Sequence, residues 1–155
     1  MSIFGGNWVF QGFAGARGTG RWSIFPRDIL GSMGPRVERI DHIQIGAPEG
    51  CEAAAREFYG GILGMAEIEK PPALRARGGC WFQCGGQQVH IGVERDFRPA
   101  KKAHPAFVVA DLDDMRQALA ARRFAVVDDS ETAPARRFYA EDPWGNRLEF
   151  VNGRT

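Results

Sequence analysis

The stretch Asp142-Pro-Trp-Gly-Asn-Arg-Leu-Glu149, near the end of the 155-residue chain, combines a chain reversal with the first half of a strand. Its proline and glycine stand where their backbone preferences favour a turn. After the turn, Leu148 and Phe150 flank Glu149, and this alternation of apolar and polar residues is typical of a half-buried strand. The stretch therefore predicts a strand over residues 147–151 that turns Glu149 away from the protein core.

The residues before this turn complete a regular unit. A strand pattern is followed by Asp111-Leu-Asp-Asp114, whose acidic residues favour the start of a helix. Leu112, Met115 and Leu119 give this helix an apolar stripe. The unit has the order βαβββ, with strands expected over residues 104–109, 124–127, 137–140 and 147–151.

The first half of the chain repeats this order. A helix is expected over residues 51–59, where the apolar side chains share one side, and Gly60-Gly61 is expected to end it. Around this helix, strands are expected over residues 40–45, 65–69, 80–84 and 88–93. The sequence therefore predicts an α+β fold made of two tandem βαβββ modules.

Three motifs in this order give the chain a family resemblance. They are Asp41-His42 at the first strand, Phe58-Tyr59-Gly-Gly-Ile-Leu63-Gly64 at the end of the first helix, and the stretch 142–149. The chain resembles the vicinal oxygen chelate superfamily over roughly residues 37–153. This family includes glyoxalase I, methylmalonyl-CoA epimerase, fosfomycin resistance thiol transferases, extradiol dioxygenases and the metal-free bleomycin-binding proteins. The resemblance implies a cupped, mixed eight-stranded sheet, with the helices on its convex face and a divalent metal ion in its concave face.

The resemblance also implies a set of metal ligands at the first and fourth strands of each module, which here are His42, His90, His104 and Glu149. Strand parity supports this set independently, because the neighbours of each strand residue point to the other face; Val89 and Ile91, for example, flank His90. His42 and His90 are 48 residues apart, and His104 and Glu149 are 45 apart, as two copies of one module require. Imidazole and carboxylate ligands suit zinc, nickel, iron or manganese. His90 is the unusual member, since relatives usually have Glu or Gln there.

The implied function is that of a metal-dependent lyase or isomerase of the glyoxalase type. Such an enzyme would chelate a small oxygen-bearing substrate and stabilise an enolate-type intermediate. Glu149 is the expected catalytic base, because it is the only carboxylate in the set. Two alternatives stay open: an extradiol dioxygenase-like oxidoreductase that uses Fe(II), and a non-catalytic protein that sequesters an antibiotic as the bleomycin-binding relatives do.

Composition limits the possible partners. A formal net charge of +1 gives no general field for nucleic acid, and no run approaches the roughly 20 apolar residues of a membrane span. Three cysteines, an odd number, favour a reducing cytoplasm over a secreted disulfide framework. The resemblance adds the expectation of a homodimer.

The chain divides into two regions. Residues 1–35 form a glycine- and aromatic-rich N-terminal extension without a period of 2 or 3.6, and residues 36–153 form the glyoxalase-like domain. Aromatic residues in such a segment are expected to be ordered only where they pack on something. We therefore hypothesise that the extension docks on its own domain or on a partner chain.

Overall fold

The fold is taken from a computed structural model of the chain, which describes residues 35–128 and 136–153. The chain divides into two units, Met1–Glu38 and Arg39–Thr155, and the second unit contains all the described helices and strands. The predicted extension, residues 1–35, lies outside the described residues except for its last residue. Its docking therefore stays a prediction.

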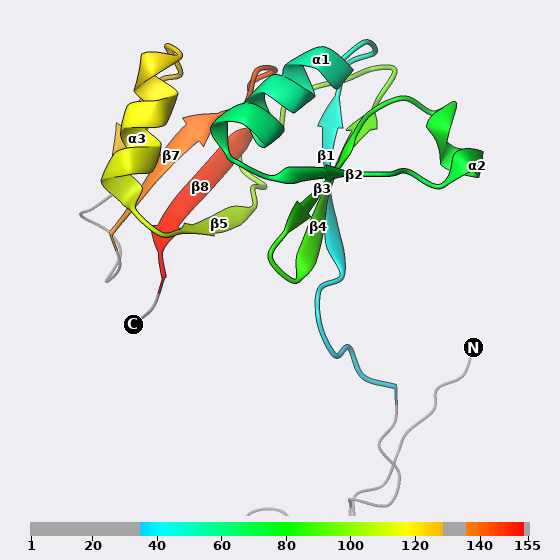
Figure 1. Ribbon diagram of the computed structural model, residues 1–155, viewed down its shortest axis with the longest axis horizontal. Coiled ribbons are helices and arrows are strands. Elements are labelled where there is room, and N and C mark those ends of the chain that lie inside the picture. Colours follow the sequence, from blue (N-terminus) through cyan, green and yellow to red (C-terminus); the bar gives the residue numbers. More distant parts are fainter. Residues whose placement is uncertain (1–34, 129–135, 154–155) are drawn as a thin grey trace, which may run out of the picture. The chain divides into compact units, whose positions relative to one another are not determined.

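The second unit contains the two predicted modules (Figure 1). In the first, helix α1 continues directly into the π-helix η2, and a short helix α2 is added between the second and third strands. The first module contains β1 (His42–Ala47), α1 (Glu52–Ala55), η2 (Arg56–Ile62), β2 (Ala66–Ile68), α2 (Pro72–Arg75), β3 (Trp81–Cys84) and β4 (Gln87–Val93). The second contains β5 (Ala106–Val109), α3 (Leu112–Ala121), β6 (Val126–Asp128), β7 (Arg137–Glu141) and β8 (Arg147–Asn152). The predicted fold class is confirmed.

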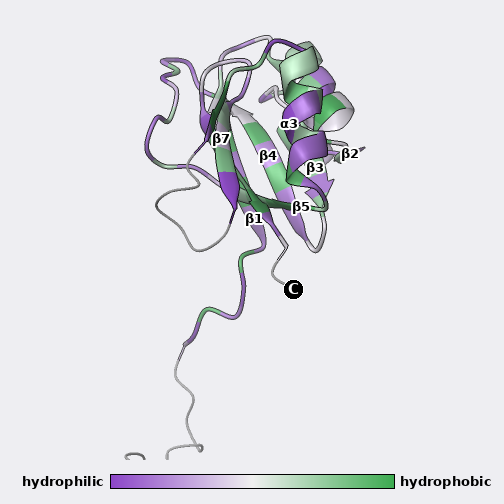
Figure 2. Ribbon diagram, turned by 90° about the vertical axis from the view of Figure 1, so that its left-hand side faces the viewer, coloured by the Kyte–Doolittle hydropathy of each residue, from purple (hydrophilic) through white to green (hydrophobic). Residues whose placement is uncertain are grey.

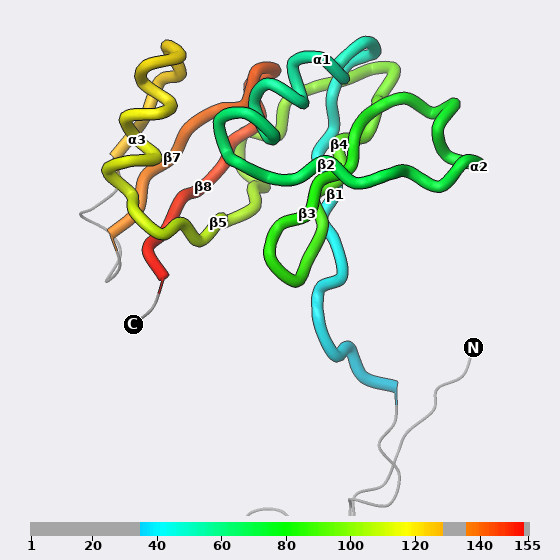
Figure 3. Tube along the Cα trace, in the orientation of Figure 1, coloured from blue at the N-terminus to red at the C-terminus, as the bar shows by residue number. Residues whose placement is uncertain are grey.

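The eight strands are divided between two four-stranded mixed sheets of identical topology. Their strand orders are β1-β4-β3-β2 and β5-β8-β7-β6. In each sheet the first and last strands of the module pair in parallel, and the other pairs are antiparallel. The connection between the modules, residues 94–105, runs from the end of β4 to the start of β5 (Figure 3). The internal repeat seen in the sequence is therefore a repeat of structure.

The helices cover one face of the sheets, and the predicted site residues lie on the other. Val89 and Ile91 of β4 and Leu148 and Phe150 of β8 are at most 1% exposed and join the helices in one apolar core. Figure 2 shows α3 on one side of β4 and β7, with hydrophobic and hydrophilic colours on different parts of the helix, as a helix with one buried stripe requires. The parity expected from the sequence is confirmed for Glu149, whose neighbours both enter this core.

The end of the first helix differs from the expectation. Gly60-Gly61 was expected to end it, but η2 runs to Ile62, and this prediction is wrong. The amide of Leu63 donates to the carbonyl of Phe58 at 2.9 Å, which is the wider i to i+5 spacing of a π-turn. Gly64 then leaves the helix with φ +70°, a conformation that favours glycine. The helix therefore ends at Ile62, three residues later than expected.

The turn motif at 142–146 joins the two modules. The Asp142 carboxylate accepts hydrogen bonds from the Tyr59 hydroxyl at 3.0 Å and from Asn146 Nδ2 at 2.8 Å. Asn146 Nδ2 also donates to the carbonyl of Gly46 in β1 at 2.9 Å, and its Oδ1 accepts from the amide of Ala100 at 2.9 Å. Burial, followed by the charge of Asp142, raises the pKa of Tyr59 well above its ordinary value. The motif is thus both a turn and a buried hydrogen-bond network that connects the two modules.

Within the described residues, no helix has both the length and the apolar composition needed to cross a membrane.

Candidate metal site

The structure brings the four predicted ligands together as two pairs. His42 and His90 lie on neighbouring strands of the first sheet, and His104 and Glu149 meet in the second module. Across residues 35–128 and 136–153, no three or more His, Cys, Asp or Glu side chains form a group that could hold a metal ion. The four predicted ligands therefore lie in two separate pairs.

The first pair is part of a stack of three rings. The His42 and His90 rings lie 4.3 Å apart with an interplanar angle of 20°, and the Trp81 ring lies 3.8 Å from the other face of His90 at 4°. His90 is only 5% exposed, and burial, followed by the charge of His42, lowers its pKa. His90 is therefore held neutral in a fixed orientation.

Ring stacking limits what this pair can bind. A metal ion lies in the plane of the imidazole that ligates it, and the planes of His42 and His90 are nearly parallel. No single ion can lie in both planes in this arrangement. His90 Nε2 lies 2.9 Å from Gln88 Oε1, whereas His42 Nδ1 lies 3.0 Å from the Asp41 carboxylate. Since a carboxylate can only accept, His42 donates from Nδ1 and keeps the lone pair on Nε2 for a ligand.

The second pair brings an imidazole nitrogen and a carboxylate oxygen into direct contact. His104 Nδ1 lies 2.7 Å from the carbonyl of Lys102, which can only accept, so Nδ1 carries a proton. In the neutral ring, Nε2 then has a lone pair, and it lies 3.0 Å from Oε2 of Glu149. Two acceptors at this distance require a second proton on the ring or a cation between them. Arg137 Nη1 donates to the other oxygen of Glu149 at 3.2 Å, which fixes the carboxylate.

The surroundings of this second pair were not identified from the sequence. Tyr139 lies opposite Glu149 in the β7–β8 ladder, and its ring meets that of His104 edge-on at 5.4 Å. The guanidinium groups of Arg147 and Arg137 lie 3.8 and 5.6 Å from the centre of the Tyr139 ring. The hairpin register carries the signal that could have found them, because residues opposite one another in an antiparallel ladder share a face.

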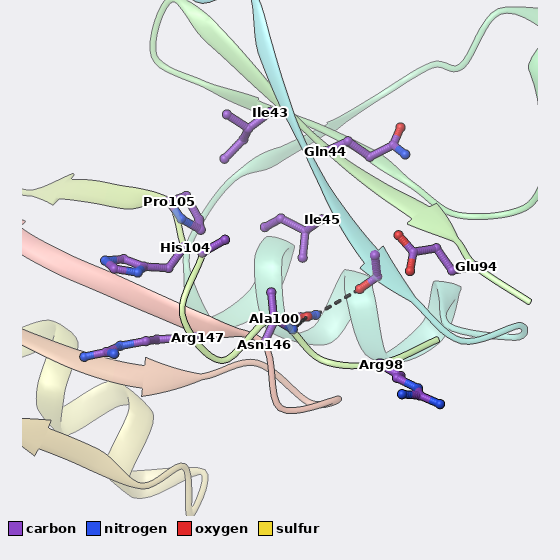
Figure 4. A pocket seen from close by; sticks show the side chains of 12 residues that line it. Ile43, Gln44, Ile45, Glu94, Arg98, Ala100, His104, Pro105, Asn146 and Arg147 are labelled. Atoms are coloured by element: carbon purple, nitrogen blue, oxygen red, sulfur yellow. Dashed lines mark hydrogen bonds between the residues drawn. The ribbon is translucent and has the colours of Figure 1, made fainter. Parts of the chain in front are cut away.

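A cavity of about 370 Å³ lies between the modules and is lined by His104 of this pair. Residues of β1 line one wall, and the segment that leads into β5 lines the other. Figure 4 shows His104 and Arg147 projecting in the same direction, while Arg98 points away from both. His104 is the one predicted ligand that lines it, because His42, His90 and Glu149 are not among its lining residues.

The donors of both pairs have the chemistry of a divalent metal site. His42 and His104 each have Nδ1 bonded to an oxygen and Nε2 available, and Glu149 contributes Oε2. Outer hydrogen bonds of this kind fix the tautomer of metal-binding histidines. The donor chemistry of these residues therefore fits a divalent metal ion, with the donors divided between the two pairs.

Comparisons with known proteins identify the family. The model of the Glyoxalase/Bleomycin resistance protein/Dioxygenase superfamily matches residues 39–150. A solved structure of a glyoxalase family protein from Bacillus anthracis is 51% identical, with a TM-score of 0.74, and the match covers 79% of this chain and all of that one.

Two more distant solved structures share the fold. A glyoxalase/dioxygenase from Nostoc punctiforme is 22% identical with a TM-score of 0.62, covering 80% of this chain and all of that one. A lactoylglutathione lyase from Agrobacterium tumefaciens is 20% identical with a TM-score of 0.59, covering 77% of this chain and 96% of that one. No curated protein matches the chain. On the match of its family model and the likeness to the Bacillus anthracis structure, the chain belongs to the glyoxalase/bleomycin resistance protein/dioxygenase superfamily.

Proposed function

We propose that the protein is a metal-dependent lyase or isomerase of the glyoxalase type, acting on a small substrate with two neighbouring oxygen atoms. The observation that carries the proposal is the contact of His104 Nε2 with Glu149 Oε2 at 3.0 Å, which brings an imidazole nitrogen and a carboxylate oxygen together. Family membership supports it, because this arrangement lies at the positions where the resemblance implies metal ligands. The ion would be zinc, nickel, iron or manganese.

His42, His104 and Glu149 would hold the ion, with His90 as the predicted fourth ligand if one of the stacked rings turns. A divalent ion there would supply stabilisation of the negative charge that develops on the oxygens of the substrate. The Lys102 carbonyl keeps His104 in the tautomer that binds through Nε2. The Asp41 carboxylate does the same for His42.

Glu149 is the proposed proton acceptor. Its side chain is 12% exposed and is held from both sides, by His104 at Oε2 and by Arg137 at Oε1. A proton taken from the carbon beside a substrate carbonyl would pass to one of these oxygens. Arg137, by donating to Oε1, orients the carboxylate.

Proton exchange tests the reaction without knowledge of the product. Metal-loaded protein is incubated in heavy water with thiol adducts of 2-oxoaldehydes and with acyl thioesters, and exchange at the carbon beside the carbonyl is followed by NMR. We expect exchange with a member of one class, and Glu149→Gln should retain some metal but slow the exchange by at least roughly 100-fold, the effect of a missing general base. Exchange at the wild-type rate in Glu149→Gln would remove this residue from the mechanism.

We further propose a homodimer in which one protomer supplies His42 and its partner supplies His104 and Glu149. Two observations support it. Within the described part of the chain the predicted donors lie in two separate pairs, each of which would be a half-site. In addition, Val108 and Val127 are 68% and 62% exposed on the same face as Glu149, where a second protomer could cover them. The three cysteines are free thiols, which supports the cytoplasm as the proposed location.

A second function, that of an Fe(II) dioxygenase, is favoured by one observation. Two histidines and one carboxylate with open positions are typical of such enzymes, and a histidine at position 90 would fill one of those positions. The observation that favours this function is the stacking of His90 on Trp81, which would keep the imidazole of His90 from filling an open position on the iron. Stoichiometric iron with oxygen uptake on catechols would support this function, whereas a protein that binds no metal would support antibiotic sequestration.

A further inference from the structure

Arg147 is a half-buried arginine that forms no salt bridge with any carboxylate of residues 35–128 and 136–153. Within the described part of the chain, its guanidinium makes no ion pair or side-chain hydrogen bond, and it lies 3.8 Å from the centre of the Tyr139 ring. The residue opposite it in the ladder, Glu141, is bonded instead to Lys101 at 2.7 Å. The guanidinium is therefore held in place by an aromatic ring while its hydrogen-bond donors stay available.

The position of Arg147 relates it to the proposed site. Arg147 precedes Glu149 by two residues in β8, so the two share a face and their Cα atoms are about 7 Å apart. The Tyr139 ring contacts both Arg147 and His104, and both residues line the cavity of about 370 Å³. Figure 4 shows the two side chains projecting in the same direction from that cavity.

The neighbouring charges distinguish Arg147 from the other arginine on this face. Arg137 donates to Glu149, so its charge is compensated within the protein. The planar guanidinium of Arg147, held over a ring, matches the geometry of a carboxylate and can bind it through two parallel hydrogen bonds. A carboxylate on a bound molecule would supply the missing negative charge.

We infer that Arg147 anchors a carboxylate of the substrate, so that the protein acts on small carboxylic acids whose two neighbouring oxygens bind beside His104 and Glu149. The binding of the two oxygens beside His104 and Glu149 rests on the proposed function, whereas the binding of a carboxylate by Arg147 does not. The inference specifies the class of substrate, which the family does not.

Two probes that differ in one carboxylate test it. Zinc-loaded protein is titrated anaerobically by calorimetry with catechol and with protocatechuate, which is catechol with an added carboxylate; zinc has no redox chemistry, so the metal oxidises neither probe. We expect protocatechuate to bind at least about tenfold more tightly than catechol, as one charge-assisted contact provides. Arg147→Gln should abolish the difference, and Arg147→Lys, which keeps the charge, should retain part of it.

Arg122→Gln is the matched control, because it removes the same charge at the end of α3, where Arg122 pairs with Glu57 at 3.3 Å. It should keep the full preference for protocatechuate. Equal affinity for both probes, no binding of either, or the same change in both glutamine variants would overturn the inference. The titrations are repeated without zinc: a preference for protocatechuate that persists there and is lost in Arg147→Gln supports the anchor even if the protein takes up no metal, an outcome that would contradict only the proposed function.

Discussion

At the scale of single residues, His90 shows how packing decides which chemistry a donor can perform. Its ring has Trp81 on one face and His42 on the other, and its Nε2 is directed at Gln88. A histidine held in this way supports the ring of His42 more directly than it could ligate the metal ion proposed to bind His42. The contribution of His90 to metal affinity should therefore come from the stacking of its ring on His42 and not from a donor atom.

Two variants at position 90 separate support from ligation. His90→Phe keeps an aromatic ring in the stack but has no donor atom, whereas His90→Gln keeps a donor but removes the ring. We expect His90→Phe to bind zinc with an affinity close to that of the wild type, and His90→Gln to lose about tenfold, the effect of a lost supporting contact. Zinc titration against a competing chelator measures both, and the opposite order would establish His90 as a ligand.

At the scale of elements, the sequence predicted the strands well because their apolar and polar residues alternate. This alternation also placed Glu149 on the correct face, since Leu148 and Phe150 both enter the core. The course of the first helix was predicted less well. A π-turn leaves no period in the sequence, and two successive glycines favour a stop unless the packing of Phe58 and Tyr59 carries the helix past them.

Gly60 and Gly79 should respond oppositely to substitution by alanine. A Cβ at Gly60, inside η2, would meet its nearest neighbours at 3.7 Å, an ordinary contact. Gly60→Ala should therefore raise the free energy of unfolding by about 0.5–1 kcal/mol, since alanine has the higher helix propensity.

Gly79 is the matched contrast. It has φ +79°, and a Cβ there would lie 2.0 Å from the carbonyl oxygen of Ile91. Gly79→Ala should lower the free energy of unfolding by about 2 kcal/mol or more, because both the backbone conformation and the contact are unfavourable. Urea denaturation of both variants checks the pair, and a loss of stability in Gly60→Ala would mean that the π-turn requires glycine.

At the scale of the whole molecule, the sequence predicted which residues form the candidate site but not how they are divided. Parity and repeat spacing lead to His42, His90, His104 and Glu149 one strand at a time. They carry no information on the distance between the two modules, which depends on tertiary contacts such as the hydrogen bonds of Asp142 with Tyr59 and Asn146. The arginines around Tyr139 were missed for the same reason, since a contact between strands depends on the hairpin register.

Mixed dimers test whether the two half-sites belong to different protomers. His42→Ala and His104→Ala each remove one imidazole, and each homodimer should lose zinc at both of its sites. If the sites are shared between protomers, a mixed dimer contains one site that lacks both histidines and one that lacks neither. Co-expression with two different affinity tags, followed by purification on both tags, should then recover about one tightly bound zinc per mixed dimer.

The same experiment has a clear opposite outcome. If the donors of each site came from a single chain, every site in the mixed dimer would lack one histidine, and zinc content would stay as low as in the two homodimers. A wild-type dimer carrying the same two tags is the positive control and should hold two ions. Elemental analysis separates these results, and the melting temperature gives an independent readout, because an ion that binds only the folded dimer stabilises it. Recovery of one zinc in the mixed dimer would show that each site takes His42 from one protomer and His104 from the other.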